Sequence, residues 1–185
     1  MHFATEGGNS CVDRRVASRE RLCYTLLSNK GVVGLVIEIP GREPIRIQHV
    51  VFDLNGTLSY DGTVLPDVPL LIRELRQHVQ CWLLTGDTYG TGARIAEELG
   101  LTLHTIQTGE DKAAMVSRLE GGVAALGNGM NDVLMLRQAQ LGIAVIGPEG
   151  AAARAVEAAD IVVPSIQAGL GLLLNPRRIV ATLRP

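Results

Sequence analysis

The stretch HVVFDLNGT at residues 49–57 decides the fold, because an apolar run ends there on a carboxylate followed by a glycine turn. The run before Asp53 shows no alternation of polar and apolar residues. Continuous runs of this kind are typical of parallel strands that are buried on both faces. Similar runs recur downstream, and they predict further strands at 81–84, 101–106, 122–126, 142–146 and 161–163.

Segments of helical periodicity separate these strands. They predict helices at 67–78, 88–99, 111–119, 131–138 and 149–158, followed by one or two short helices at 166–174 and 176–183. Alternating strands and helices with short connections indicate an α/β fold, in which a parallel sheet is covered by helices on both faces. We expect residues 32–185 to form one such domain.

The segment upstream of residue 49 follows different patterns. A β-branched run at 34–39, a Pro-Gly turn at 40–44 and an alternating stretch at 45–47 predict a β-hairpin. Residues 1–31 lack a periodic pattern, and we expect a poorly structured or partly helical extension, with a short helix over 13–27. Its arginines leave a second interpretation open, a basic docking arm (Arg14, Arg15, Arg19 and Arg21).

Composition excludes several classes of protein. The chain has 185 residues, 17 Lys and Arg against 19 Asp and Glu, 46% hydrophobic residues and 3% aromatic residues. A net charge of −2 gives no electrostatic footprint for nucleic acid or an anionic membrane. Three cysteines without paired spacing favour neither a disulfide framework nor a zinc site. No signal peptide and no apolar stretch of about 20 residues is present, so we expect a cytoplasmic protein without membrane contact.

Polar residues gather where the predicted strands end. Asp53 ends the first buried strand, Thr-Gly-Asp at 85–87 ends the next, a Gly/Asn/Asp loop at 127–132 ends a third, and Lys112 lies near a helix start. The carboxyl ends of parallel strands meet at one edge of the sheet, where ligands bind. A carboxylate nucleophile, a hydroxyl and a lysine that hold phosphate, and oxygen ligands for Mg²⁺ together predict phosphoryl transfer.

Each of these residues also has a structural interpretation when taken alone. Asp53 could open an Asx turn, and Thr85 could belong to a plain strand-to-helix turn capped by Asp87 or Thr88. Lys112 could be a solvated helix residue, and the loop at 127–132 could simply cap a helix. Their order along the chain and their shared place at strand ends favour the functional interpretation.

The sequence resembles the haloacid dehalogenase (HAD) superfamily. FDLNGTL at 52–58 is similar to its first motif, and Lys112 lies where the lysine of the third motif belongs. LLTGD at 83–87 and GNGMND at 127–132 are similar to the second and fourth motifs, in the form found in the phosphorylation domain of P-type ATPases. The resemblance covers about residues 50–163. It implies a Rossmann-like HAD domain, preceded here by the β-hairpin and closest to small soluble P-type-ATPase-like proteins.

The resemblance also implies roles for the motif residues. Asp53 would be the nucleophile that forms an aspartyl-phosphate, while Thr85, Lys112 and the glycines Gly56 and Gly86 would hold the phosphoryl group. Mg²⁺ would be the cofactor. Its expected ligands are Asp53, the backbone carbonyl of Asn55 and the Asn128 side chain, with Asp132 acting directly or through water, and with Asn131 and Asp87 ordering the surroundings.

Two positions depart from the hydrolase pattern. Asn55 replaces the aspartate that serves phosphatases of this superfamily as general acid/base, a role worth about 10²- to 10⁴-fold. Asn128 replaces a metal-binding aspartate and removes one negative charge. We therefore expect slow turnover. The alternatives are a non-catalytic binding module, a phosphoryl-holding regulatory domain or, less favoured by strand order, a response-regulator receiver.

The spacing between motifs leaves no room for a cap domain. The gaps at 57–85 and 87–112 hold only a short turn, single helices and a strand. A capless site has to be closed by a large substrate or by a neighbouring subunit, or else stay open. We therefore expect a homo-oligomer that acts on a phosphorylated substrate whose identity the sequence does not specify.

Overall fold

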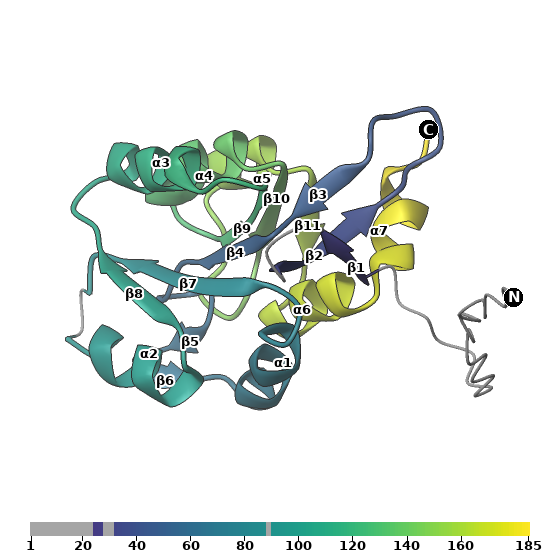
Figure 1. The fold of residues 1–185 in the computed structure, drawn as a ribbon. Helices are drawn as coiled ribbons and strands as arrows, with labels where there is room; N and C mark the ends of the chain where they lie inside the picture. The colour runs from purple at the N-terminus through teal and green to yellow at the C-terminus, as the bar shows by residue number, and fades with distance from the viewer. Residues whose placement is uncertain (1–23, 28–31, 88–89) are drawn as a thin grey trace, which may run out of the picture.

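The computed structural model describes residues 24–27 and 32–185, apart from residues 88–89. Its centre is a six-stranded parallel sheet with the strand order β11-β10-β9-β4-β7-β8 (Figure 1). The strands are β4 (His49–Phe52), β7 (Gln80–Thr85), β8 (Thr102–Thr105), β9 (Val123–Gly127), β10 (Leu141–Val145) and β11 (Ile161–Val163). The predicted parallel sheet is confirmed, and every predicted strand end lies within one residue of the observed end.

Helices cover both faces of this sheet (Figure 1). One face carries α3 (Gly109–Arg118), α4 (Val133–Gln138) and α5 (Ala153–Ala158), and the other carries α1 (Val68–Leu75), α2 (Gly92–Leu99) and α6 (Ile166–Leu174). The short helix η1 (Met130–Asp132) precedes α4, and α7 (Pro176–Leu183) packs beside the N-terminal strands. In β4, Phe52 packs with the α1 side and Val51 with the α3 side, which explains its uninterrupted apolar run.

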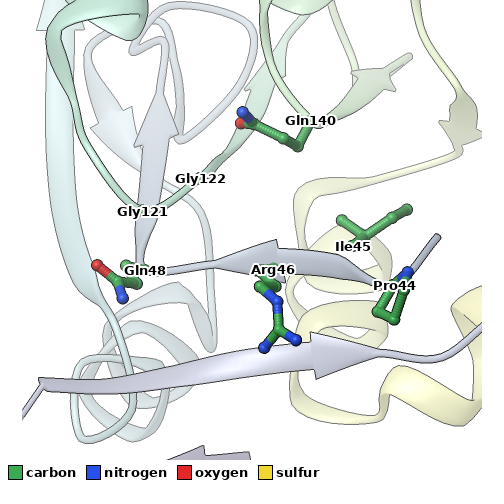
Figure 2. Close-up of a pocket in the computed structure, with 7 residues that line it drawn as sticks. All are labelled: Pro44, Ile45, Arg46, Gln48, Gly121, Gly122 and Gln140. Carbon is green, nitrogen blue, oxygen red and sulfur yellow. The ribbon is translucent and has the colours of Figure 1, made fainter. Parts of the chain in front are cut away.

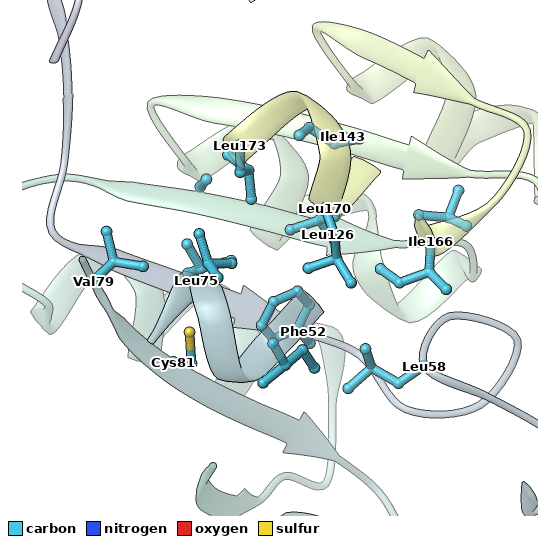
Figure 3. Close-up of a cluster of buried hydrophobic side chains, with 14 of the residues drawn as sticks. Phe52, Leu58, Leu75, Val79, Cys81, Leu126, Ile143, Ile166, Leu170 and Leu173 are labelled. Atoms are coloured by element: carbon cyan, nitrogen blue, oxygen red, sulfur yellow. The ribbon is translucent and has the colours of Figure 1, made fainter. Parts of the chain in front are cut away.

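The larger core lies on the face covered by α1, α2 and α6. Figure 3 shows Phe52, Leu126 and Ile143 of the sheet meeting Leu75 of α1 and Leu170 of α6. All five side chains are 1% exposed or less. Burial of each such side chain contributes about 1.5–3 kcal/mol, so this cluster fixes β4 and β9 and, with them, the loops that follow their carboxyl ends.

Two helices begin later than the sequence predicts. The helix expected at 88–99 begins at Gly92, because Asp87 (φ 51°) and Gly90 (φ 65°) have left-handed backbone conformations that a helix cannot contain. The helix expected at 149–158 begins at Ala153, and Gly150 (φ 79°) lies in the loop before it. In both places the shortened helix leaves a loop at the carboxyl end of a strand.

The N-terminal strands form a separate antiparallel sheet with the order β1-β2-β3. The predicted hairpin is confirmed as β2 (Val32–Ile37) and β3 (Ile45–Ile47). The helix expected over 13–27 is wrong at its end, because Tyr24–Leu27 is strand β1 and pairs with β2. This pairing extends the sheet beyond the domain boundary expected at residue 32. The rest of that helix and the proposed arginine arm lie outside the described residues.

The connections around the first two sheet strands are short. Between β4 and β7 lie the two-stranded ribbon of β5 (Ser59–Tyr60) and β6 (Thr63–Val64) and the helix α1. Between β7 and β8 the structure describes α2 and its flanking turns. In the described part of the chain, none of the helices combines the length and apolar character needed to cross a membrane.

Candidate active site

The order of the strands creates a crevice next to β4. The chain runs from β4 to β7 and β8 on one side and then returns to β9 on the other side, so the connections from β4 and β9 diverge. Ligands bind at such switch points, outside the carboxyl ends of the strands. A cavity of about 290 Å³ lies there, and its lining residues are Asp53, Asn55, Thr85, Gly86, Asn128, Gly129, Asn131 and Glu149.

Lys112 of α3 does not line the cavity itself and reaches it through Asp53. Its Nζ donates to Asp53 Oδ1 at 2.5 Å and to Asp132 Oδ1 at 2.7 Å, and the side chain is only 1% exposed. Reciprocal hydrogen bonds between Thr108 and Asp111 fix the first turn of α3, which carries the lysine. Lysine is buried at such a position only when paired, so the interpretation as a solvated residue is wrong.

The charges around Lys112 do not balance. Burial raises the pKa of Asp53 to about 7, and the neighbouring carboxylate of Asp132 acts in the same direction against the attraction of Lys112. Burial alone would lower the pKa of Lys112, but the two carboxylates outweigh it and raise that pKa. Two carboxylates and one ammonium leave a site that attracts a further cation.

Asp132 is fully buried and does not line the cavity. Its Oδ2 accepts hydrogen bonds from the backbone N–H groups of Asn128 (2.9 Å) and Gly129 (2.8 Å), while Oδ1 holds Lys112. A Cβ atom at Gly127 would lie 2.6 Å from the Asp132 carboxyl carbon, so glycine is required there. The structure gives Asp132 a positioning role, and its expected contact with a cation stays a prediction.

Asn128 is held at both ends of its amide group. Its Oδ1 accepts from Thr57 Oγ1 at 3.2 Å, and its Nδ2 donates to the backbone carbonyl of Gly150 at 3.0 Å. These partners assign the orientation of the amide. Gly56 (φ 75°) lies directly against it, where a Cβ atom would come within 2.3 Å of Nδ2. Gly56 is absent from the cavity lining and makes room for Asn128, so its phosphate contact stays a prediction.

Asn55 contributes a polar atom without a partner. Its Oδ1 is buried and accepts no hydrogen bond from any residue that the structure describes. An unsatisfied buried group of this kind costs about 1–3 kcal/mol. Asn55 and Asp53 both line the cavity, and an amide has no proton of suitable acidity to donate.

Thr85 and Asp87 shape the other side of the cavity. Thr85 Oγ1 accepts from the backbone N–H of Asp87 at 2.9 Å, and we find no acceptor for its own proton among the described residues. Asp87 Oδ1 accepts from the N–H of Gly92 at 2.6 Å, at the start of α2. The N-cap residue of α2 is Thr91 and not Asp87, although the Asp87 side chain accepts the first backbone N–H of the helix. Thr85 lines the cavity.

Sequence reasoning missed Glu149. We expected this residue at the start of a helix, but it lies in the loop between β10 and α5 and lines the cavity. The sequence could have indicated Glu149, because it follows β10. The carboxyl end of β10 lies at the same edge of the sheet as those of the other parallel strands. Asn131, expected only to order the surroundings, also lines the cavity.

A second cavity lies at the opposite edge of the sheet (Figure 2). It encloses about 460 Å³ beside the starts of β4 and β9, and its lining residues are Pro44, Ile45, Arg46, Gln48, Gly121, Gly122 and Gln140. Gln140 Oε1 accepts from the N–H of Val123 at 2.6 Å. The lining contains neither a carboxylate nor a hydroxyl side chain, and Asp53, Thr85 and Lys112 do not belong to it.

Comparison with known proteins gives two kinds of sequence relative. No family model matches the chain. An uncharacterized protein of Methanocaldococcus jannaschii is 52% identical over 62 residues, which are 34% of this chain and 67% of that protein. A copper-exporting P-type ATPase of Staphylococcus epidermidis is 36% identical over 136 residues, which are 70% of this chain but only 16% of the ATPase.

Solved structures show the same relationship. One is the 3-deoxy-D-manno-octulosonate 8-phosphate phosphatase of Moraxella catarrhalis, whose structure contains magnesium and phosphate. It superposes with a TM-score of 0.59 at 20% identity, over 75% of this chain and 94% of the phosphatase chain. At this identity the likeness shows the fold alone. A zinc-transporting PIB-type ATPase has a TM-score of 0.56 at 31% identity, over 64% of this chain and 20% of its own. The chain has the fold of haloacid dehalogenase (HAD) family hydrolases, and most of its length is similar to a part of P-type ATPases.

Proposed function

We propose that this chain is a Mg²⁺-dependent phosphohydrolase or phosphotransferase that forms an aspartyl-phosphate on Asp53. The observation that carries the proposal is the buried bridge from Lys112 Nζ to Asp53 Oδ1 and Asp132 Oδ1. It fixes one oxygen of Asp53 at the wall of the cavity and brings a positive charge to the point where a phosphoryl group would be transferred.

The residues present fit a magnesium ion. Asp53 and Asn128, which both carry side-chain oxygens, line the cavity, and the charge around Lys112 is negative when Asp53 is ionised. Hard cations prefer such oxygen ligands. Asp53, the backbone carbonyl of Asn55 and the Asn128 amide would hold the ion. When bound, Mg²⁺ supplies positive charge to the phosphoryl oxygens and lowers the cost of bringing an anion to a carboxylate.

In the first step, a carboxylate oxygen of Asp53 attacks phosphorus, and the bond to the leaving oxygen breaks with its electron pair. Thr85 Oγ1 donates its free proton to a phosphoryl oxygen, and Lys112 offsets the charge on Asp53. Asn55 cannot protonate the leaving oxygen. Substrates whose leaving groups depart as stable anions, such as aryl and acyl phosphates, should therefore react faster than alkyl phosphates.

In the second step, water attacks phosphorus, and the bond from phosphorus to Asp53 breaks and restores the carboxylate. The attacking water must lose a proton, which the amide of Asn55 cannot accept. The aspartyl-phosphate should therefore be long-lived. The same observation favours the second candidate function, a regulatory or binding module that holds the phosphoryl group.

The experiment that tests the proposal is covalent labelling with acetyl phosphate in the presence of Mg²⁺, read by mass spectrometry after an acid quench. We expect one phosphoryl group on Asp53 and none on Asp53→Asn. The matched control is Asp67→Asn, because Asp67 is exposed at the start of α1 and lies outside the cavity. Hydrolysis of an aryl phosphate by the same proteins separates the enzyme from the phosphoryl-holding module. Labelling of Asp53→Asn at the wild-type level would reject Asp53 as the acceptor.

A further inference from the structure

Glu149 lines the cavity with a side chain that the proposed reaction does not use. It is exposed, and it forms no hydrogen bond or ion pair that the structure shows with the described residues. Of the carboxylates around the site, Asp53 and Asp132 are both held by Lys112. Glu149 is thus a cavity-lining carboxylate that remains available to a ligand.

The loop that carries Glu149 is tied to Asn128 at two points. Asn128 Nδ2 donates to the carbonyl of Gly150 at 3.0 Å, and the N–H of Ala152 donates to the carbonyl of Asn128 at 2.8 Å. An ionised aspartate at position 128 would instead turn an oxygen toward the Gly150 carbonyl, with no proton to donate. Compared with aspartate, asparagine at position 128 therefore lacks one negative charge but fixes the loop that brings Glu149 to the cavity.

Electrostatics indicates what Glu149 can bind. An exposed carboxylate that lines the cavity repels a phosphate anion, and Asp53, Asp132 and Lys112 do not offset that repulsion. A divalent cation between the carboxylate and the phosphate turns this repulsion into attraction. Asn55, whose buried Oδ1 has no partner in the described structure, is a further polar residue that lines the cavity.

The sheet order places Glu149 on one side of the cavity. β10 lies next to β9, which Asn128 directly follows, whereas β7 with Thr85 lies on the far side of β4. Glu149 thus lies on the same side of β4 as Asn128, the proposed cation ligand, and not on the side of Thr85, whose hydroxyl is proposed to hold phosphate. The described residues contain no group of three or more His, Cys, Asp or Glu side chains close enough to hold a metal directly, which favours contact through water.

We propose that Glu149 is a positioning carboxylate for the cation. It accepts hydrogen bonds from waters in the hydration shell of Mg²⁺, of which the ion usually keeps several, and it replaces the charge that position 128 lacks. This inference rests on the proposed function. Partners of this outer kind typically contribute about 10- to 100-fold to metal affinity.

Calorimetric titration with Mg²⁺ tests the proposal on the full chain. We expect Glu149→Gln to weaken Mg²⁺ binding about 10-fold. The matched control is Glu157→Gln, which removes the same charge from an exposed position on α5 outside the cavity and should leave the affinity unchanged. In EDTA both variants should unfold at the wild-type temperature, and only Glu149→Gln should lose stabilisation by added Mg²⁺. Equal affinities of wild type and Glu149→Gln would overturn the proposal.

A double-mutant cycle tests the compensation between the two positions. If Glu149 replaces the charge absent at position 128, Glu149→Gln should cost a smaller factor in affinity in the Asn128→Asp background than in the wild type. An equal factor in both backgrounds would overturn this part of the proposal. Labelling of Asp53 keeps the two hypotheses apart. If Asp53 is labelled and Glu149→Gln leaves Mg²⁺ affinity unchanged, the proposed function stands and the inference about Glu149 fails. If Glu149→Gln weakens Mg²⁺ binding but Asp53 is not labelled, the inference about Glu149 stands and the proposed aspartyl-phosphate fails.

Discussion

Asp53 and Asp132 share one ammonium group, that of Lys112, at distances of 2.5 and 2.7 Å from its Nζ. The two carboxylates come from residues that are far apart in sequence, and both are almost completely buried. Burial is the main reason for the raised pKa of Asp53, and the second carboxylate adds to it because one positive charge cannot satisfy both. The raised pKa also has a measurable consequence for stability.

Asp53→Asn should stabilise the metal-free protein above pH 7. Because burial and Asp132 raise the pKa of Asp53 from 3.8 to about 7, the folded state keeps a proton that the unfolded state releases between these values. The stability associated with that proton is present at low pH and is lost as the pH rises through about 7. The neutral amide avoids this loss. We expect an increase in Tm of at least about 3 °C at pH 8 in EDTA, the shift that about 1 kcal/mol produces in a domain of this size.

Thermal unfolding across pH 5–8 checks this prediction, and the difference between the two proteins should shrink toward pH 5. Burial lowers the pKa of His49, but this residue is common to both proteins, so its titration cancels in the difference. Added Mg²⁺ should stabilise the wild type more than the variant. A lower Tm for Asp53→Asn at pH 8 would show that the attraction between Lys112 and Asp53 outweighs the burial of the carboxylate.

Asn128→Asp should tighten Mg²⁺ binding and destabilise the metal-free protein. The new carboxylate restores a charged oxygen ligand, but it loses the bond to the Gly150 carbonyl and leaves that oxygen unpaired, at a cost of about 1–3 kcal/mol. Calorimetry and unfolding in EDTA measure the two effects. Asn175→Asp is the control, because Asn175 is exposed and its Nδ2 likewise donates to a glycine carbonyl, that of Gly171. Unchanged or weaker Mg²⁺ affinity would place Asn128 outside the ligand set.

The sequence was most informative where one rule applied to many residues. A parallel sheet collects the carboxyl ends of its strands at one edge, so Asp53, Thr85 and Asn128 could be brought together without any knowledge of distances. The rule could not supply backbone conformations. The left-handed φ of Gly150, which delays the start of the helix expected at 149–158 and leaves Glu149 in a loop, became visible only in three dimensions.

Pairing between distant residues was the second limit of the sequence. Nothing in the pattern around Asp132 indicates that its side chain turns away from the cavity to hold Lys112 and two backbone N–H groups. Strand β1 is a similar case. Residues 24–27 are too short a stretch to show a period, and they become a strand because β2 offers an edge with which to pair.

We expect the protein to form a homo-oligomer. The connections after β4 and β7 contain one small ribbon and single helices in their described parts, which leaves the closure of the cavity to a neighbouring subunit or a large substrate. The N-terminal sheet also ends in strand edges that can pair with another copy. Light scattering across a range of concentrations measures the mass in solution. A monomeric mass at the highest concentration would leave closure to the substrate.

Asn55→Asp should raise the rate of phosphate release. A carboxylic acid at this position can protonate the leaving oxygen and, once ionised, accept the proton of the water that attacks the aspartyl-phosphate. Such a group contributes about 10²- to 10⁴-fold, equivalent to about 3–5 kcal/mol in the barrier. Asn55 already lines the cavity together with Asp53, and its buried Oδ1 has no partner among the described residues. Aspartate has nearly the same shape as asparagine, so the substitution requires no new space.

A comparison of two substrates shows which of the two reaction steps Asn55→Asp accelerates. An alkyl phosphate needs protonation of its leaving oxygen, whereas an aryl phosphate does not, so an effect on the first step should be much larger for the alkyl phosphate. Equal gains for both would place the benefit in hydrolysis of the aspartyl-phosphate. Asn131→Asp is the control, because it adds a carboxylate to the same cavity at another wall and should bring no comparable gain. If Asn55→Asp is no faster while Mg²⁺ binds and Asp53 is still labelled, Asn55 is not simply a missing acid. The chain is then better described as a domain that holds the phosphoryl group.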